Sequence, residues 1–148
     1  MKIPTKGRYA VSAMLDLALN DKIRPLTIAE IAEKQNISLS YLEQIFAVLR
    51  KNGLVRGMRG PGGGYRLAQG IDSITIAQVI RSVDETVLKS EGDTPEYLPY
   101  ELWVELSKQI YNFLDGITLA HCITNLETRK QLENQLLMKE SATESVAA

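Results

Sequence analysis

The chain has 148 residues, enough for one compact domain and an appended helical element. Its single cysteine excludes a disulfide framework within the chain and is typical of a reducing compartment. The sequence contains neither the apolar run of a signal peptide nor a stretch long enough to span a membrane. We therefore expect a cytoplasmic protein with no membrane partner.

The formal net charge of −1 hides an uneven distribution of charged residues. Residues 1–66 contain 11 Lys and Arg against 5 Asp and Glu, whereas residues 67–148 contain 6 against 13. A basic N-terminal half suits a polyanionic partner such as nucleic acid. An acidic C-terminal half suits solubility and contacts with protein partners.

The first predicted helix follows Thr5 and covers about residues 7–19. Its apolar side chains occur on more than one face, which predicts a core helix. Lys6 and Arg8 lie at its positive end, where they could meet a phosphate group. Charged residues at a helix start are also commonly just solvated, and the sequence leaves both interpretations open.

Two short helices are predicted between residues 27 and 53. Thr27 and Glu30 form a capping box that starts the first helix, and an asparagine ends it. The second helix starts at Ser38 or Ser40, because Ser40 with Glu43 would make another capping box. Its apolar residues recur every three or four positions, and it takes the place of a recognition helix. Its candidate DNA-binding residues are Ser38, Ser40, Tyr41, Glu43, Gln44 and Arg50.

A glycine-rich hairpin follows, with strands predicted at residues 54–58 and 65–67. Arg56, Arg59 and Arg66 lie on this hairpin, and guanidinium groups on a flexible loop suit phosphate contact or a narrow minor groove. A solvated charged hairpin is the plainer interpretation, but its position directly behind two short helices favours DNA binding. The other candidate DNA-binding residues of the hairpin are Gly60, Gly62 and Tyr65.

The same glycines could instead cradle a phosphate in a nucleotide-dependent enzyme. Such a loop needs a helix directly behind the glycines, and a Walker loop also needs Lys followed by Ser or Thr. Here Tyr65, Arg66 and Leu67 follow. The sequence therefore favours a protein that is not an enzyme.

The C-terminal half contains further predicted helices. Thr75 and Gln78 cap one of them, and residues 87–99 interrupt every helical pattern with glycine and proline. An amphipathic helix ends near Gly116, a short helix runs from Thr118 through Leu126, and the last dozen residues look frayed. The apolar stripe of the amphipathic helix consists of Leu102, Trp103, Leu106, Ile110, Phe113 and Leu114.

This stripe needs a cover, because a winged domain is complete without the amphipathic helix. Two copies packed across a two-fold axis would supply it, and the alternative is that the helix folds back on its own domain. We therefore predict an α+β, mainly helical fold: a winged helix-turn-helix domain with a long C-terminal dimerisation helix. The predicted parts are the DNA-binding domain at 1–86, a loop at 87–99, dimerisation helices at 100–126 and a partly disordered tail at 127–148.

Four strings of residues in the N-terminal part are long and specific: KGRYAV at 6–11, ISLSYLEQ at 37–44, LRKNGLV at 49–55 and RGPGGGY at 59–65. Through them the sequence resembles the IscR-like family of bacterial winged-helix iron–sulphur cluster regulators. The resemblance implies a homodimer with recognition helices in successive major grooves of a palindromic operator and wings in the flanking minor grooves. It also implies that Arg59 lies in the minor groove and that Glu43 helps to discriminate between two operator classes. The residues implied to contact DNA from the recognition helix are Ser38, Ser40, Tyr41 and Gln44.

The sequence departs from this family at the 2Fe-2S cluster. The resemblance places three cysteines and one histidine in the segment that corresponds to residues 87–99, and none occurs there. The only histidine and the only cysteine of the chain are His121 and Cys122. Adjacent residues of a helix point about 100° apart, and two ligands do not complete a cluster site. We expect no cofactor and no metal site. A cluster shared across the dimer is the alternative.

The leading functional hypothesis is a sequence-specific transcriptional regulator that binds a palindromic operator as a homodimer, without a cluster. The alternative is a regulator or interaction module whose DNA binding is controlled by a protein partner, as in relatives concerned with cysteine metabolism. In that case the acidic C-terminal half would be the docking surface.

Overall fold

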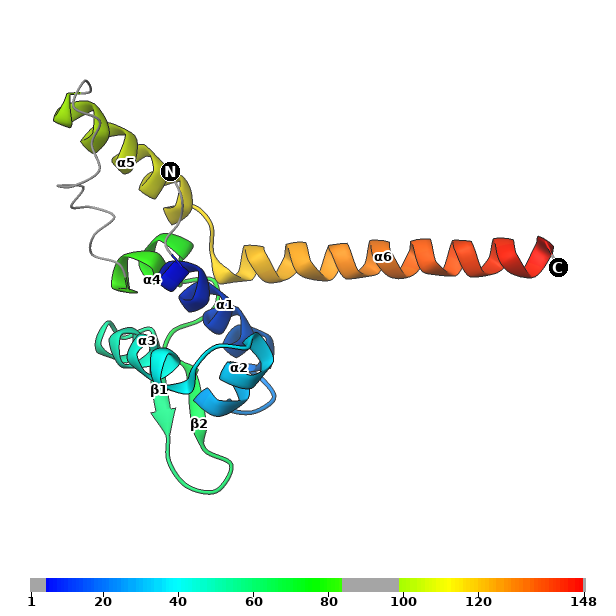
Figure 1. Cartoon of the computed structure of the whole chain (residues 1–148), viewed down its shortest axis with the longest axis horizontal. Helices are drawn as coiled ribbons and strands as arrows, with labels where there is room; N and C mark the ends of the chain where they lie inside the picture. The colour runs from blue at the N-terminus through cyan, green and yellow to red at the C-terminus, as the bar shows by residue number, and fades with distance from the viewer. Residues whose placement is uncertain (1–4, 84–98, 148) are drawn as a thin grey trace.

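The computed structural model describes residues 5–83 and 99–147. Its elements follow one another along the chain as shown in Figure 1. They are α1 (Thr5–Asn20), α2 (Ile28–Gln35), α3 (Leu39–Lys51), β1 (Val55–Met58), β2 (Gly64–Leu67), α4 (Ile76–Val83), α5 (Tyr100–Asp115) and α6 (Leu119–Ala147).

The apolar core lies between α1, α3 and α4. Met14, Phe46 and Val79, one from each of these helices, are fully buried in it. The first residue of α6, Leu119, is buried in the same core. As the sequence predicted, α1 buries more than one face, because it packs against α4 as well as against the hairpin and α6.

The two predicted short helices are present as α2 and α3. The capping box of Thr27 and Glu30 starts α2, and Asn36 ends it in the left-handed conformation that asparagine tolerates. For α3, Ser38 is the N-cap: its Oγ accepts a hydrogen bond from the Tyr41 N–H at 3.1 Å. The alternative start at Ser40 with a capping box to Glu43 is wrong, because Ser40 already lies inside the helix.

The hairpin is the predicted wing. Val55 pairs with Leu67 at its base and Met58 with Gly64 next to its tip, in antiparallel register. The turn between them needs glycine, since a Cβ at Gly63 would lie 2.4 Å from the Met58 carbonyl oxygen. The fold is therefore a mainly helical winged helix-turn-helix, as the sequence predicted.

The junction of α5 and α6 is fastened to the segment before α4. The Thr75 hydroxyl donates to an Asp115 carboxylate oxygen at 2.9 Å, and the Ile76 N–H donates to the Ile117 carbonyl at 2.9 Å. The Leu119 N–H in turn donates to the Ile74 carbonyl at 3.0 Å. These bonds fix where α5 ends and α6 begins, and the two helices leave the winged domain in different directions (Figure 1).

The length of α6 corrects the prediction for the C-terminus. A short helix through Leu126 and a frayed tail were expected, whereas α6 continues to Ala147. The polar composition suggested disorder, but after Thr118 the sequence has no glycine or proline and is rich in Leu, Glu and Ala, which favour helix.

The predicted loop at 87–99 lies almost wholly outside the described residues, which resume at Pro99, the N-cap of α5. Among the helices that are described, none is both long enough and apolar enough to cross a membrane.

Candidate nucleic-acid interface

The first turns of α3 present the predicted recognition surface. Ser38, Ser40, Glu43 and Gln44 are exposed there, while the opposite face of the helix is buried in the core. The Ser38 oxygen already accepts the Tyr41 N–H, but a hydroxyl that accepts one bond can still donate another. The exposed groups therefore include donors and acceptors able to read base edges or bind phosphate.

Tyr41 is half-buried and differs from its neighbours in having an aromatic contact. The Tyr41 and Tyr9 rings meet edge to face, with centroids 5.9 Å apart and planes at 82°. This contact joins the start of α1 to the start of α3. The predicted phosphate-contacting residues Lys6 and Arg8 lie on the first turns of α1, where Arg8 is exposed and Lys6 is half-buried.

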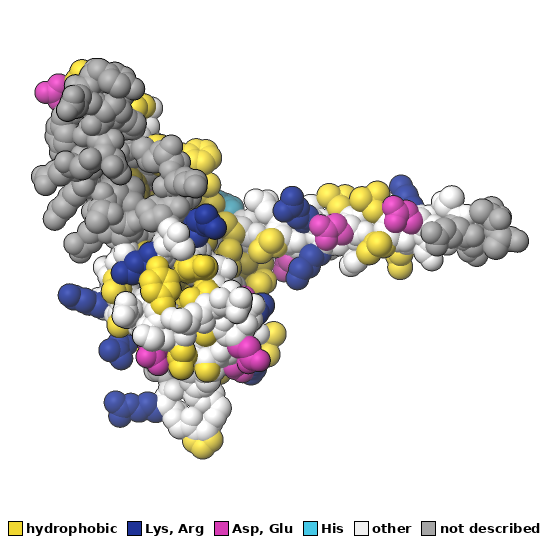
Figure 2. All heavy atoms as spheres, in the orientation of Figure 1, with side chains coloured by type: hydrophobic (Ala, Val, Ile, Leu, Met, Phe, Trp, Pro, Cys, Tyr) yellow, Lys and Arg dark blue, Asp and Glu magenta, His cyan; other side chains and the backbone are white. Residues whose placement is uncertain are grey.

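The arginines extend from α3 onto the wing. Arg50 is exposed near the C-terminal end of α3, and Arg56 and Arg59 are exposed on β1 and the following turn. Figure 2 shows Lys and Arg side chains projecting along the edge where α3 and the hairpin lie. Gly60 and Gly62 have φ of +95° and +73°, so they hold the turn in conformations that residues with a Cβ rarely adopt.

Tyr65 occupies a different environment from the other predicted wing residues. Its half-buried ring meets Phe46 of α3 with centroids 4.9 Å apart. It thus packs the wing onto the recognition helix. The sequence grouped Arg66 with the other arginines of the hairpin as a candidate for phosphate or minor-groove contact, but its guanidinium donates a hydrogen bond to the Asp21 carbonyl.

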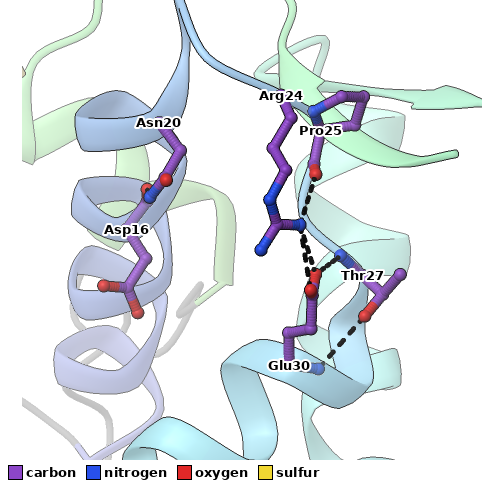
Figure 3. Close-up of polar contacts among 6 residues, drawn as sticks. All are labelled: Asp16, Asn20, Arg24, Pro25, Thr27 and Glu30. Atoms are coloured by element: carbon purple, nitrogen blue, oxygen red, sulfur yellow. Dashed lines mark hydrogen bonds and ion pairs between the residues drawn. The ribbon is translucent and has the colours of Figure 1, made fainter. Parts of the chain in front are cut away.

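The start of α2 is fixed by a small polar group, shown in Figure 3. A Glu30 carboxylate oxygen accepts the Thr27 N–H at 2.8 Å, and the Arg24 guanidinium forms an ion pair with Glu30 at 2.9 Å. The hydrogen bond from the Thr27 backbone, followed by that from Arg24, holds the pKa of Glu30 below its ordinary value. This group anchors the loop that carries Leu26 to the first turn of α2.

The predicted dimerisation stripe is largely exposed. Leu102, Leu106 and Ile110 of α5 are between 37% and 43% exposed, and Phe113 is 71% exposed. Leu114 instead packs half-buried against the core of its own chain, and the side chain of Trp103 lies outside what the structure describes. On another face of α5, Tyr111 is buried and the Arg81 guanidinium lies 5.0 Å from its ring centroid. This contact with α4 holds α5 on the domain, while no described residue covers the stripe fully.

An exposed helix start, an arginine-bearing wing and a winged helix-turn-helix fold together define a DNA-binding transcriptional regulator. Residues 3–125 match the model of the Rrf2 family, described as an iron-dependent transcriptional regulator. The chain belongs to the Rrf2 family.

Relatives of known sequence or structure agree with this assignment. The chain is 49% identical to the HTH-type transcriptional regulator IscR of Erwinia tasmaniensis, with 86% of this chain and 81% of the relative covered. The structure of T. potens IscR matches with a TM-score of 0.73 at 38% identity, covering 87% of this chain and 90% of that one. CymR, the global cysteine regulator of B. subtilis, matches with a TM-score of 0.71 at 34% identity, covering 84% and 98%.

The residues present do not fit the 2Fe-2S cluster that the resemblance implies. Such a cluster takes four protein ligands, mainly thiolates, whereas the whole sequence has one cysteine and one histidine. The His121 Nδ1 accepts the Thr118 N–H at 3.2 Å as part of the cap of α6. Partial burial raises the pKa of the Cys122 thiol, which disfavours the thiolate that binds metal. Within the described parts of the chain, no group of three His, Cys, Asp or Glu residues could hold a metal ion.

Proposed function

We propose that this chain regulates transcription by binding a palindromic operator as a homodimer, and that it does so without an iron–sulphur cluster. The observation that carries the proposal is the joint exposure of the first turns of α3 and of Arg59 on a wing that packs against α3 through Tyr65. A helix start suits the major groove, and an arginine-bearing turn suits the adjacent minor groove.

The homodimer is supported by apolar surface on both C-terminal helices. The stripe on α5 leaves Leu102, Leu106, Ile110 and Phe113 uncovered by the described part of the chain. Beyond Leu119, which is buried, α6 also exposes Leu132, Leu136, Leu137 and Met138 at 56–75%. A 29-residue helix is about 43 Å long, so α6 extends well beyond its own domain, and these side chains are accessible to a second copy. Burial of these residues between two copies would remove a large apolar area from water.

Cluster independence is supported by the chemistry of the donor set. The Nδ1 of the exposed His121 is used in the cap of α6 and Cys122 packs half-buried beside the core, so each subunit offers at most one imidazole nitrogen and one partly buried thiol. Protein purified without oxygen should be colourless and contain no iron bound to sulphide. It should bind the same operator before and after oxidation. A brown preparation with two irons per dimer, bleached by Cys122→Ala, would establish a cluster shared across the dimer instead.

Control by a protein partner is a second candidate, favoured by the similarity to the cysteine regulator CymR over 84% of this chain. The acidic C-terminal half would then be the docking surface for a basic partner. Measurement of operator affinity with and without the partner distinguishes this candidate from autonomous regulation. A partner-controlled regulator would gain or lose operator affinity when the purified partner is added, whereas an autonomous one would not respond.

Genome-wide mapping of the bound sites is the experiment that tests the proposal. Cluster-independent operator binding predicts one two-fold symmetric sequence motif at the bound sites, under both aerobic and anaerobic growth. The absence of a shared motif would contradict sequence-specific binding, and motif occupancy under only one condition would contradict cluster independence.

A further inference from the structure

The base of the wing is joined to the loop between α1 and α2. The Leu26 N–H donates to the Tyr65 carbonyl at 3.1 Å, and the Tyr65 N–H donates to the Leu26 carbonyl at 2.6 Å. Leu26 thereby acts as a one-residue third strand along the outer edge of β2. The wing is thus attached on two sides, to this loop and, through the Tyr65 ring, to Phe46 of α3.

The attachment requires very close approach of two backbone segments. Gly64 has φ of +150°, and a Cβ on it would lie 2.5 Å from the Leu26 carbonyl oxygen. A side chain at this position would push the loop off β2. Glycine therefore serves the docking of the wing here, and not the flexibility of its tip.

Two arginines face each other across the wing but have different surroundings. Arg56 of β1 and Arg66 of β2 are directly paired in the ladder, an arrangement that repulsion disfavours unless one charge is engaged elsewhere. Arg56 is exposed and makes no side-chain hydrogen bond or ion pair with any described residue. Arg66 is half-buried, and its guanidinium donates to the carbonyl of Asp21, just beyond the C-terminal end of α1. The negative end of a helix dipole favours a cation at this place.

We propose that Arg66 is a positioning residue of the wing: its hydrogen bond to the Asp21 carbonyl, together with the Leu26–Tyr65 pairing, sets the angle at which Arg59 approaches DNA. Arg66 is thereby withdrawn from the phosphate backbone, although it is an arginine of a DNA-binding hairpin. This inference rests on the proposed operator binding, and it names the residue that orients the wing for that task.

The positioning role can be tested first in the free protein by amide hydrogen exchange. Arg66→Met removes the donor but keeps a long side chain, so the Leu26 and Tyr65 amides should exchange about tenfold faster. The Phe46 amide in the core of α3 should keep its rate, which would show that the change is local. Arg56→Met is the matched control and should leave all three amides unchanged. Wild-type exchange rates at Leu26 and Tyr65 in Arg66→Met would overturn the proposal.

A double-mutant cycle on operator DNA supplies the second test. Suppose that Arg66 acts only by orienting Arg59. Arg66→Met and Arg59→Ala should then each weaken binding about tenfold, and the double variant should be no weaker than either one. Two independent phosphate contacts would instead multiply to about a hundredfold loss, which would contradict the positioning role.

Arg66→Lys is the variant to use if Arg66→Met folds poorly. It keeps a positive charge but on a shorter side chain, without the terminal guanidinium nitrogen that donates to the Asp21 carbonyl, so a simple phosphate contact predicts wild-type affinity. The positioning role predicts a loss of affinity that is absent in the Arg59→Ala background, and unchanged binding by Arg66→Lys would overturn it. If the wild-type protein does not prefer the operator over a scrambled duplex, the proposed function fails. The exchange measurement then still decides whether Arg66 holds the wing.

Discussion

The Tyr9 ring of α1 meets the Tyr41 ring of α3 edge to face, with centroids 5.9 Å apart. Tyr41 is the residue whose N–H donates to the Ser38 cap, so the contact bears on the first turn of the recognition helix. Both rings are half-buried. The start of α1 therefore supports the residues that we propose to contact DNA.

Loss of this ring contact should weaken operator binding. Tyr9→Ala should lower the affinity by about threefold to tenfold, the usual worth of an aromatic pair, whereas Tyr9→Phe should retain most of it. Fluorescence anisotropy with a labelled operator measures both. Thermal unfolding serves as the control for loss of core packing. Equal affinities for Tyr9→Ala and the wild type would show that Tyr41 needs no such support.

Arg59→Ala should weaken DNA binding, because Arg59 is an exposed arginine on the tip of the wing. If Arg59 meets phosphate, the loss should be uniform across sequences, with a shallower dependence of affinity on salt concentration. If it reads a narrowed minor groove, the preference for A·T pairs in the flanks should relax. Titrations of flank variants at several salt concentrations separate the two. A variant that binds every duplex as the wild type does would leave Arg59 without a role.

Leu106→Asp should convert the proposed dimer to monomer. Leu106 is 38% exposed in the chain, and a carboxylate buried without a partner at the interface costs several kcal/mol in each copy. Asn112→Asp adds the same charge at an exposed position of α5 and is the matched control. Light scattering at low micromolar concentration should show a monomer for Leu106→Asp only. A dimer for both variants would place the interface elsewhere, with α6 as the next candidate.

The capping box of α2 should contribute a pH-dependent part of the stability. Folding lowers the pKa of Glu30. The contribution of Glu30 to the stability of the fold is therefore fully present above its pKa in the unfolded chain, and it is lost as the pH falls through the lower pKa of the folded state. Glu30→Gln should therefore destabilise the protein at pH 7 and become indistinguishable from the wild type at strongly acidic pH. Thr27→Ala, which removes the reciprocal bond, should cost about 1 kcal/mol. Urea unfolding at several pH values tests both, and a pH-independent difference for Glu30→Gln would contradict the assignment.

Local patterns in the sequence predicted local structure well. The capping box of Thr27 and Glu30 was predicted because both partners lie within one helical turn, and the periodic apolar residues of α3 predicted its buried face. The sequence could not show whether Ser38 or Ser40 is the N-cap of α3, because both are serines and the backbone conformation decides which of them caps the helix. The end of α6 was misplaced because helix propensity without apolar periodicity gives a weak signal.

Contacts between distant parts of the chain were not predictable from one sequence. Arg66 was grouped with the other basic residues of the hairpin, but its hydrogen-bond acceptor is a backbone carbonyl 45 residues earlier. A carbonyl carries no sequence signature, so only the fold reveals this partner. The packing of Tyr65 on Phe46 is of the same kind. The opposition of Arg56 and Arg66 across the strands was a usable hint, since one of two facing cations tends to find another partner.

The most direct test of the operator-binding homodimer compares three duplexes at one fixed salt concentration: the mapped operator, the operator with one half-site scrambled, and the fully scrambled duplex. The protein should be purified without oxygen and measured before and after oxidation. A cluster-independent homodimer should lose much of its affinity when one half-site is scrambled and more when both are, with identical values in the two redox states. Equal affinity for all three duplexes, or tight binding in only one redox state, would contradict it.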